Sequence, residues 1–192
     1  MIGARILALL TLFLQPLDAQ IIIPRLIDAK IAVSAPNLNF LQGKTLDRLR
    51  NGQSVSFDFQ IQILDGAKPL ARSLQRFVLS YDLWEESYSA VQMSQTSPRL
   101  PIYSTARLKP EALAGWCLNR MALPFPAVDK TKLLTLHLEI RSSGTHITNP
   151  LRPQGTVDLG VLVELFSRPP DPRELRFTAQ SQPFTLSTLV SP

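Results

Sequence analysis

The chain has 192 residues, of which 45% are hydrophobic and 18% are charged, and its formal net charge is +5. This composition indicates a packed globular protein and excludes an intrinsically disordered chain, which would be less apolar and more charged. The 16 prolines outnumber the 8 glycines, and because proline cannot donate to a sheet ladder, we expect them in loops and at strand edges.

The first nineteen residues have the pattern of a secretory signal peptide. Arg5 precedes an apolar run over residues 6–14, Pro16 follows the run, and Ala19 is a small residue before the expected cut. Signal peptides have such a run of about 7–15 apolar residues, whereas a membrane span needs roughly 20.

We therefore expect residues 1–19 to be a signal peptide and residues 20–192 to form one domain. The protein would then be exported, either to the periplasm or out of the cell. The alternative is an uncleaved anchor extended through Ile21–Ile23, and only in that case would the chain contact the membrane.

Several segments alternate apolar and polar residues, which is typical of half-buried strands. The first places Ile27, Ala29, Ile31 and Val33 on one inward face. The clearest covers Ser54–Leu64, and the turn signal Asp65-Gly66 predicts a hairpin into a partner strand over Leu70–Trp84, with Leu83 on its inward face. Further strands are expected around Tyr88, Ala90 and Met93, over Leu134–Ile140, over Leu175–Ala179 and over Phe184–Val190.

Helices are predicted to be few and short. The segment Thr45–Gly52 has Thr45 as a capping residue and ends on a glycine, and Pro110 suits the first turn of a helix over Glu111–Met121. The segment Thr156–Ser167 fits both helix and strand, and we favour a helix because two prolines follow it.

These elements predict a mainly β fold. Strands at hairpin spacing indicate an antiparallel sheet or a two-sheet β-sandwich, with an immunoglobulin-like arrangement as one form, carrying two or three short helices. Four loops are expected, over Ser94–Pro101, Leu123–Asp129, Ser142–Gly155 and Arg168–Arg173.

The residues suited to catalysis are sparse. His137 and His146 belong to no metal-binding motif, and the chain has neither a serine-nucleophile motif nor a glycine-rich phosphate loop. Cys117 is the only cysteine and has apolar neighbours, so we expect it in the core rather than in an intermolecular disulfide or as a nucleophile. We therefore predict no catalytic, cofactor-binding or metal-binding residues and no enzymatic activity.

The basic residues do not form a nucleic-acid footprint. Their tightest groups are Lys44/Arg48/Arg50 and Lys130/Lys132, whereas such a footprint gathers basic residues on one face with aromatic residues between them. We expect no nucleic-acid partner.

Two features are suited to protein contact. Tyr81, Trp84 and Tyr88 concentrate aromatic side chains around one turn, where they either bind a partner or pack across the hairpin. The segment Arg168–Pro172 has the composition of a polyproline ligand, although we favour a stiff surface loop.

Part of the chain resembles a known family. The resemblance lies in Gly43–Gly52, Ser54–Leu64, the sequence RFVLSYD at Arg76–Asp82, and Glu86–Tyr88. These segments are similar to a family of short exported bacterial proteins of unknown function, whose genes are often found beside nitrogen-regulation sensor kinases. The resemblance covers residues 26–93 and implies no activity.

The sequence thus favours a non-enzymatic exported binding or assembly module of the bacterial cell envelope, with an envelope protein as its partner. One alternative is an exported hydrolase that uses His137, His146 and the acidic residues Asp82, Glu85 and Glu86. The other is a carrier of an apolar ligand. The oligomeric state stays open.

Overall fold

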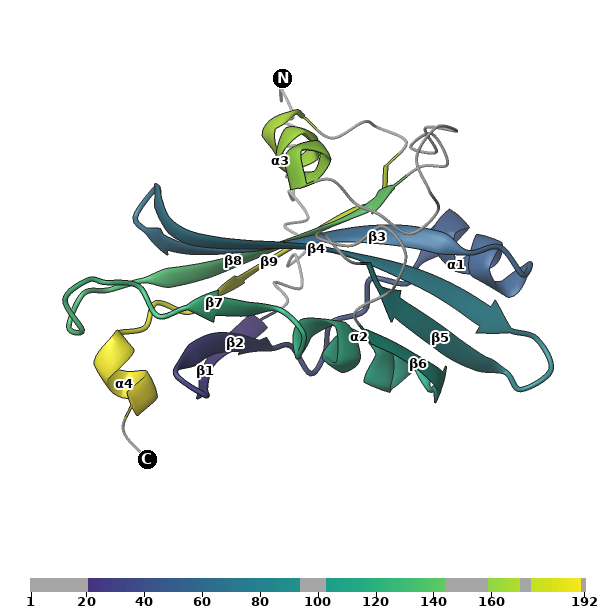
Figure 1. The fold of residues 1–192 in the computed structure, drawn as a ribbon, viewed down its shortest axis with the longest axis horizontal. Helices are drawn as coiled ribbons and strands as arrows, with labels where there is room; N and C mark the ends of the chain where they lie inside the picture. Colours follow the sequence, from purple (N-terminus) through teal and green to yellow (C-terminus); the bar gives the residue numbers. More distant parts are fainter. Residues whose placement is uncertain (1–20, 94–102, 144–158, 170–173, 191–192) are drawn as a thin grey trace, which may run out of the picture.

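The structure is a computed structural model that describes residues 21–93, 103–143, 159–169 and 174–190 (Figure 1). The elements in chain order are β1 (Ile21–Ile27), β2 (Lys30–Ser34), α1 (Gly43–Arg50), β3 (Val55–Asp65), β4 (Lys68–Asp82), β5 (Ser87–Gln92), β6 (Tyr103–Leu108), α2 (Pro110–Leu118), β7 (Ala122–Pro124), β8 (Thr135–Ser143), α3 (Leu159–Ser167), β9 (Arg176–Ser181) and α4 (Leu186–Val190). The prediction of a mainly β fold is confirmed.

The strands form one nine-stranded sheet in the order β6-β5-β4-β3-β8-β9-β1-β2-β7. The β1–β9 pair is parallel, and the other neighbouring pairs are antiparallel. Of the two predicted architectures, the structure therefore has the single sheet rather than the sandwich. The sheet is curled, and α2 contacts β5 near one end of it and β2 near the other (Figure 1). Helix α2 thus bridges the open side of the curl.

The concave face of the sheet carries the main core. All five predicted inward residues of β3 are buried, namely Val55, Phe57, Phe59, Ile61 and Ile63. Phe40, from the segment between β2 and α1, packs edge-on against the rings of Phe57 and Phe59 at centroid distances of 5.0 and 5.4 Å. Such edge-on pairs are the favoured aromatic geometry, so Phe40 anchors the irregular segment before α1 to the sheet.

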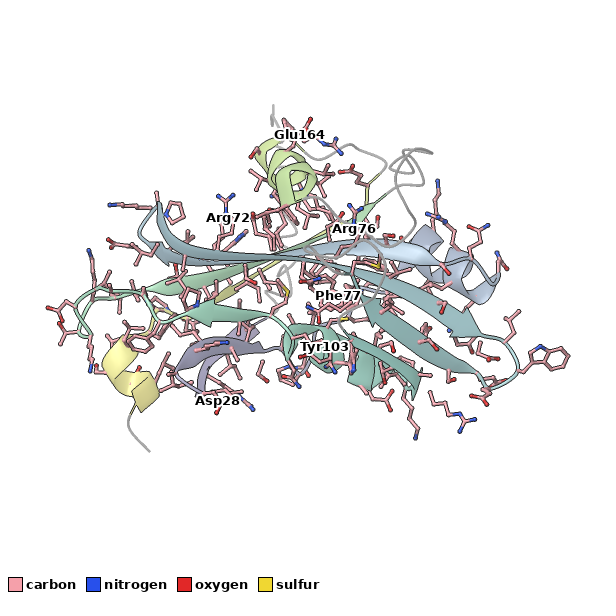
Figure 2. The ribbon with its side chains drawn as sticks, viewed as in Figure 1. Asp28, Arg72, Arg76, Phe77, Tyr103 and Glu164 are labelled. Carbon is pink, nitrogen blue, oxygen red and sulfur yellow. The ribbon has the colours of Figure 1, made fainter. Side chains whose placement is uncertain are left out.

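The opposite face of the central strands is polar and is covered in part by α3. Figure 2 shows Arg72 and Arg76 on the side of the sheet that faces α3, with Phe77 on the other side. Leu74 and Leu162 form a small second apolar cluster there. The predicted helix is confirmed over Leu159–Ser167, while residues 156–158 lie outside the described residues.

The hairpin at Asp65-Gly66 is confirmed. Asp65 pairs with Lys68 across the turn, and Gly66 has a φ of +57°, a left-handed conformation that glycine adopts without a steric penalty. The partner strand ends at Asp82, so Leu83 is not inward-facing as predicted but lies exposed in the turn that follows.

The prediction of one strand from Ile27 to Val33 is wrong, because the chain reverses there. Asp28 and Ala29 have φ values of +48° and +57° and form the turn between β1 and β2, in which Ile27 pairs with Lys30. Ile31 and Val33 are buried, whereas Ile27 and Ala29 are exposed. A two-residue turn preserves the period of two along the sequence, so the alternation concealed the reversal.

The predicted strand over Phe184–Val190 is also wrong. Phe184 forms an isolated bridge with Leu134, and the chain then turns into the short helix α4. Thr185 precedes this helix, and its hydroxyl oxygen accepts a long hydrogen bond of 3.4 Å from the Thr188 amide. Threonine is favoured at this capping position, which gives the local reason for the helix.

The other two predicted helices are present with shifted ends. Helix α1 begins at Gly43, so Thr45 is a buried residue within it rather than its cap. Helix α2 begins at Pro110 as predicted and ends at Leu118.

Among the predicted loops, Leu123–Asp129 begins within the short strand β7, and most of the other three lies outside the described residues. None of the helices in the described ranges combines the length and apolar character needed to cross a membrane.

Candidate functional site

The three aromatic residues around the β4–β5 turn fall into two environments. Tyr81 and Tyr88 face each other across the strand pair, with ring centroids 4.8 Å apart. Tyr88 is 2% exposed, whereas Trp84 is 97% exposed. The structure therefore brings the two tyrosines together at the base of the hairpin and leaves Trp84 free in solvent at its tip.

Hydrogen bonds support the tip, defined here as residues Asp82–Glu86. The Asp82 carboxylate accepts hydrogen bonds from the backbone amides of Trp84, at 2.8 Å, and Glu85, at 3.1 Å. The Glu85 carboxylate accepts two hydrogen bonds of 2.9 Å from Arg107 on β6, and this contact raises the pKa of Arg107. The tip is thus bound both to itself and to the neighbouring strand.

The end of the tip is apolar, and the residues around it are acidic. Leu83 is 57% exposed beside Trp84, and Asp82, Glu85 and Glu86 are also exposed. Exposed aromatic residues on a fixed support are typical anchors of protein interfaces. The surface complementary to this tip is an apolar recess with basic residues at its border.

A pocket of about 210 Å³ lies below the same hairpin, against the concave face of the sheet. Six apolar residues line it: Leu38, Phe40, Leu41, Leu46, Pro110 and Ala114. Its polar lining residues are Asn39, Arg50 and Tyr88. The pocket joins Tyr88 of the predicted contact set to residues from three other segments of the chain.

Sequence reasoning missed this pocket. Arg50 was identified only as one member of a basic group, and nothing in the sequence joins it to Tyr88 or Pro110. Helix α1 and the start of α2 bring these residues together in space, and no local pattern encodes such a meeting.

Of the two histidines, only His137 lies in the described part of the chain. His137 on β8 is half-buried between Gln62 of β3 and Gln180 of β9 in the sheet register. Burial lowers its pKa, and Arg176 acts in the same direction, while Glu139 opposes them. His146 lies outside the described residues. Across the described ranges, no group of three or more His, Cys, Asp and Glu side chains is arranged to hold a metal ion.

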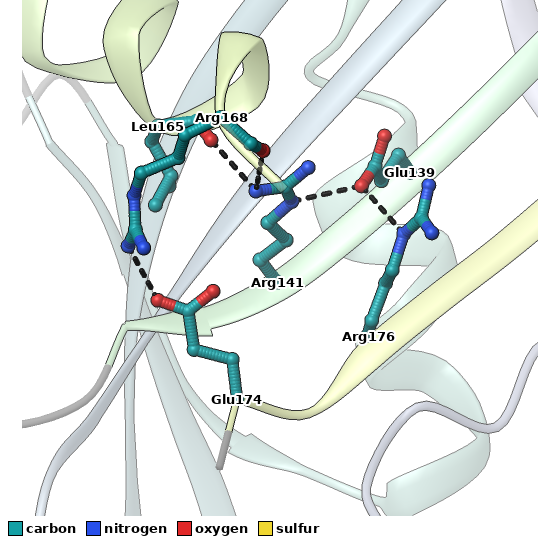
Figure 3. Close-up of polar contacts among 6 residues, drawn as sticks. All are labelled: Glu139, Arg141, Leu165, Arg168, Glu174 and Arg176. Carbon is teal, nitrogen blue, oxygen red and sulfur yellow. Dashed lines mark hydrogen bonds and ion pairs between the residues drawn. The ribbon is translucent and has the colours of Figure 1, made fainter. Parts of the chain in front are cut away.

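The acidic and basic residues beside His137 serve a structural network, shown in Figure 3. Glu139 accepts hydrogen bonds of 2.8 Å from Arg141 and from Arg176. Arg141 also donates to the backbone carbonyl oxygens of Leu165, at 2.6 Å, and Arg168, at 3.1 Å. Glu139 and Arg141 therefore hold the end of α3 on the sheet.

Cys117 lies in the core, as predicted. The side chain is fully buried on α2, and burial raises the pKa of its thiol. A protonated, inaccessible thiol is a poor nucleophile.

Comparison of the chain with models of protein families, with curated proteins and with solved structures found no match. The resemblance to the exported bacterial family over residues 26–93 therefore stays a prediction.

Proposed function

We propose that this protein is a non-enzymatic, exported binding or assembly module of the bacterial cell envelope, and that the hairpin tip contacts its partner. The observation that carries the proposal is the position of Trp84, 97% exposed on a turn fixed by Asp82. Burying an exposed tryptophan removes a large apolar surface from water. No described contact within the chain uses this surface.

The fixed geometry of the tip supports binding rather than a purely structural role. The Asp82 and Glu85 contacts already order the turn. The turn should therefore lose little further conformational entropy when a partner binds. The acidic collar, formed by Asp82, Glu85 and Glu86, favours a partner with an apolar recess bordered by lysine or arginine. Complementary charge speeds and orients association. We propose an envelope protein with such a recess as the partner.

Site-specific crosslinking in cells tests the contact. A photoreactive amino acid is placed at Leu83, beside Trp84, and, as the matched control, at Ala67, which is an exposed residue in the turn between β3 and β4. We expect one envelope protein to crosslink from position 83 and not from position 67. Crosslinking of the same proteins from both positions, or from neither, would contradict the proposed contact.

Two further variants separate shape from charge. Trp84→Ala should abolish the crosslink to a reporter placed at Leu83, whereas Trp84→Phe should retain part of it. Glu86→Lys should slow association, because it reverses one charge of the acidic collar while leaving the Glu85–Arg107 pair intact. An unchanged crosslinking yield in both Trp84→Ala and Glu86→Lys would show that the contact lies elsewhere.

Export rests on the apolar run over residues 6–14 and has its own test. Intact mass measurement of the protein from cell fractions should show a chain that begins at Gln20 in the periplasm or the medium. A full-length chain confined to the cytosol would refute this part of the proposal.

A further inference from the structure

The pocket below the hairpin has apolar walls and a positive charge. Arg50 is its one charged lining residue, and among the described residues no carboxylate forms an ion pair with it. Helix α2 starts at the pocket with Pro110 in its first turn and with no side-chain cap. Glu111 in the same first turn opposes the partial positive charge of the helix start, so the exposed Arg50 is the group that suits the pocket to an anion.

Tyr88 adds a hydrogen-bond donor to the same pocket. The residue is 2% exposed and lines the pocket. Its hydroxyl oxygen is not one of the described side-chain atoms that are fully buried without a partner, so the hydroxyl is accessible and can donate a hydrogen bond to an acceptor in the pocket.

The size and lining of the pocket indicate a small ligand. The volume of about 210 Å³ lies below the usual range of about 300–1,000 Å³ for small-molecule sites. Six of the nine lining residues are apolar, so the uncharged part of the ligand is a hydrocarbon group.

We infer that this pocket binds a small-molecule carboxylate with a short apolar chain, with the carboxylate held by Arg50 and the Tyr88 hydroxyl. Guanidinium groups bind carboxylates through charge-assisted hydrogen bonds. The site is separate from the partner contact of Trp84.

Titration of the purified protein with hexanoate, followed by two-dimensional NMR, tests this inference. Hexan-1-ol and acetate are the comparison probes, since one lacks the charge and the other lacks the chain. We expect hexanoate to bind with a dissociation constant of about 1 mM and to shift the amide signals of residues 38–41 and 111–114. Equal affinity for hexanoate and acetate, equal affinity for hexanoate and hexan-1-ol, or no shifts in these two segments would overturn the inference.

Variants assign the roles of the two polar residues. Arg50→Gln should weaken hexanoate binding about tenfold and Tyr88→Phe about fivefold, since each removes a hydrogen bond to a charged group. The matched control is Arg48→Gln on the same helix, because Arg48 bonds to Gln53 instead and does not line the pocket. An equal loss of hexanoate affinity in Arg48→Gln and Arg50→Gln would show that only the net charge of the protein matters. That result would refute the site.

A third variant separates the two proposals of function. Trp84→Ala removes the proposed partner contact and should leave hexanoate affinity unchanged. Loss of crosslinking without loss of hexanoate binding supports the independence of the sites, whereas a parallel loss of both would contradict it.

Discussion

Asp58 on β3 and Arg76 on β4 form a two-pronged ion pair across the centre of the sheet. The Arg76 Nε and Nη2 atoms lie 2.6 and 2.8 Å from the two oxygens of the Asp58 carboxylate. The side chain of Asp58 is fully buried, and that of Arg76 is 10% exposed. Both charges are therefore removed from water, and each compensates the other across the two strands.

Removal of one partner of this pair should destabilise the protein strongly. We expect Asp58→Ala to lower the free energy of unfolding by about 3–5 kcal/mol, because the buried Arg76 would lose two hydrogen bonds to a charged partner. Glu85→Ala, which breaks the exposed Glu85–Arg107 pair, should cost much less, because water and salt screen an exposed pair. Urea unfolding measures both, and equal losses in the two variants would contradict this assignment.

Arg141 should control the attachment of α3 rather than the stability of the sheet alone. Arg141→Met removes the hydrogen bonds to the carbonyl oxygens of Leu165 and Arg168 and the stacking of the guanidinium on Phe166. Amide hydrogen exchange should then accelerate in α3 much more than in β3. The comparison variant is Arg176→Met, which loses its bond to Glu139 and should leave exchange in α3 unchanged. Uniform acceleration in α3 and β3 would show that Arg141 has no special role for the helix.

His137 should make stability depend on mildly acidic pH. Burial lowers its pKa in the folded protein below the ordinary value of about 6.5, so the unfolded chain binds this proton at a higher pH than the folded chain. The free energy of unfolding therefore falls as the pH drops from about 6.5 through the folded-state pKa.

Thermal unfolding of His137→Gln measures this contribution. The variant should lose less stability than the natural chain between neutral and mildly acidic pH, and NMR should show His137 titrating below the ordinary value. Parallel stability curves for the two proteins would be inconsistent with the burial effect.

Cys117 should react only when the protein opens. Its side chain is 0% exposed, and burial raises the pKa of the thiol, so little thiolate is present and reagents have no access. Labelling with a thiol reagent should proceed at the rate of global unfolding and become rapid in urea. Fast labelling of the folded protein would show that α2 separates readily from the sheet.

The sequence predicts the fold well where burial of one strand face produces an alternating pattern of apolar residues. It does not predict which distant segments of the chain lie side by side. The alternate residues of β3 were predicted to share one face because every second residue of a strand points to the same side; they are Val55, Phe57, Phe59, Ile61 and Ile63. The turn at Asp28-Ala29 escaped detection because it contains no glycine or proline. The placement of β8 beside β3, and of β9 beside β1, joins segments far apart in the chain, and no local signal specifies such pairs.

The candidate site was predictable only in part. The concentration of aromatic residues around one turn was visible in Tyr81, Trp84 and Tyr88, but their separation into a base and a tip depends on where β4 ends. The pocket was hidden because its lining residues come from four segments, which the curled sheet and two short helices bring together.

The exposure of Trp84 in living cells tests the proposed function most directly. Brief oxidative labelling of intact cells and of the purified protein, followed by mass spectrometry, reports how accessible this side chain is in each. We expect oxidation of Trp84 to be several-fold lower in cells than in the purified protein, with the half-buried Trp116 as the internal reference that does not change. Equal oxidation of Trp84 in both samples would show that nothing covers the hairpin tip and would contradict its role as a partner contact.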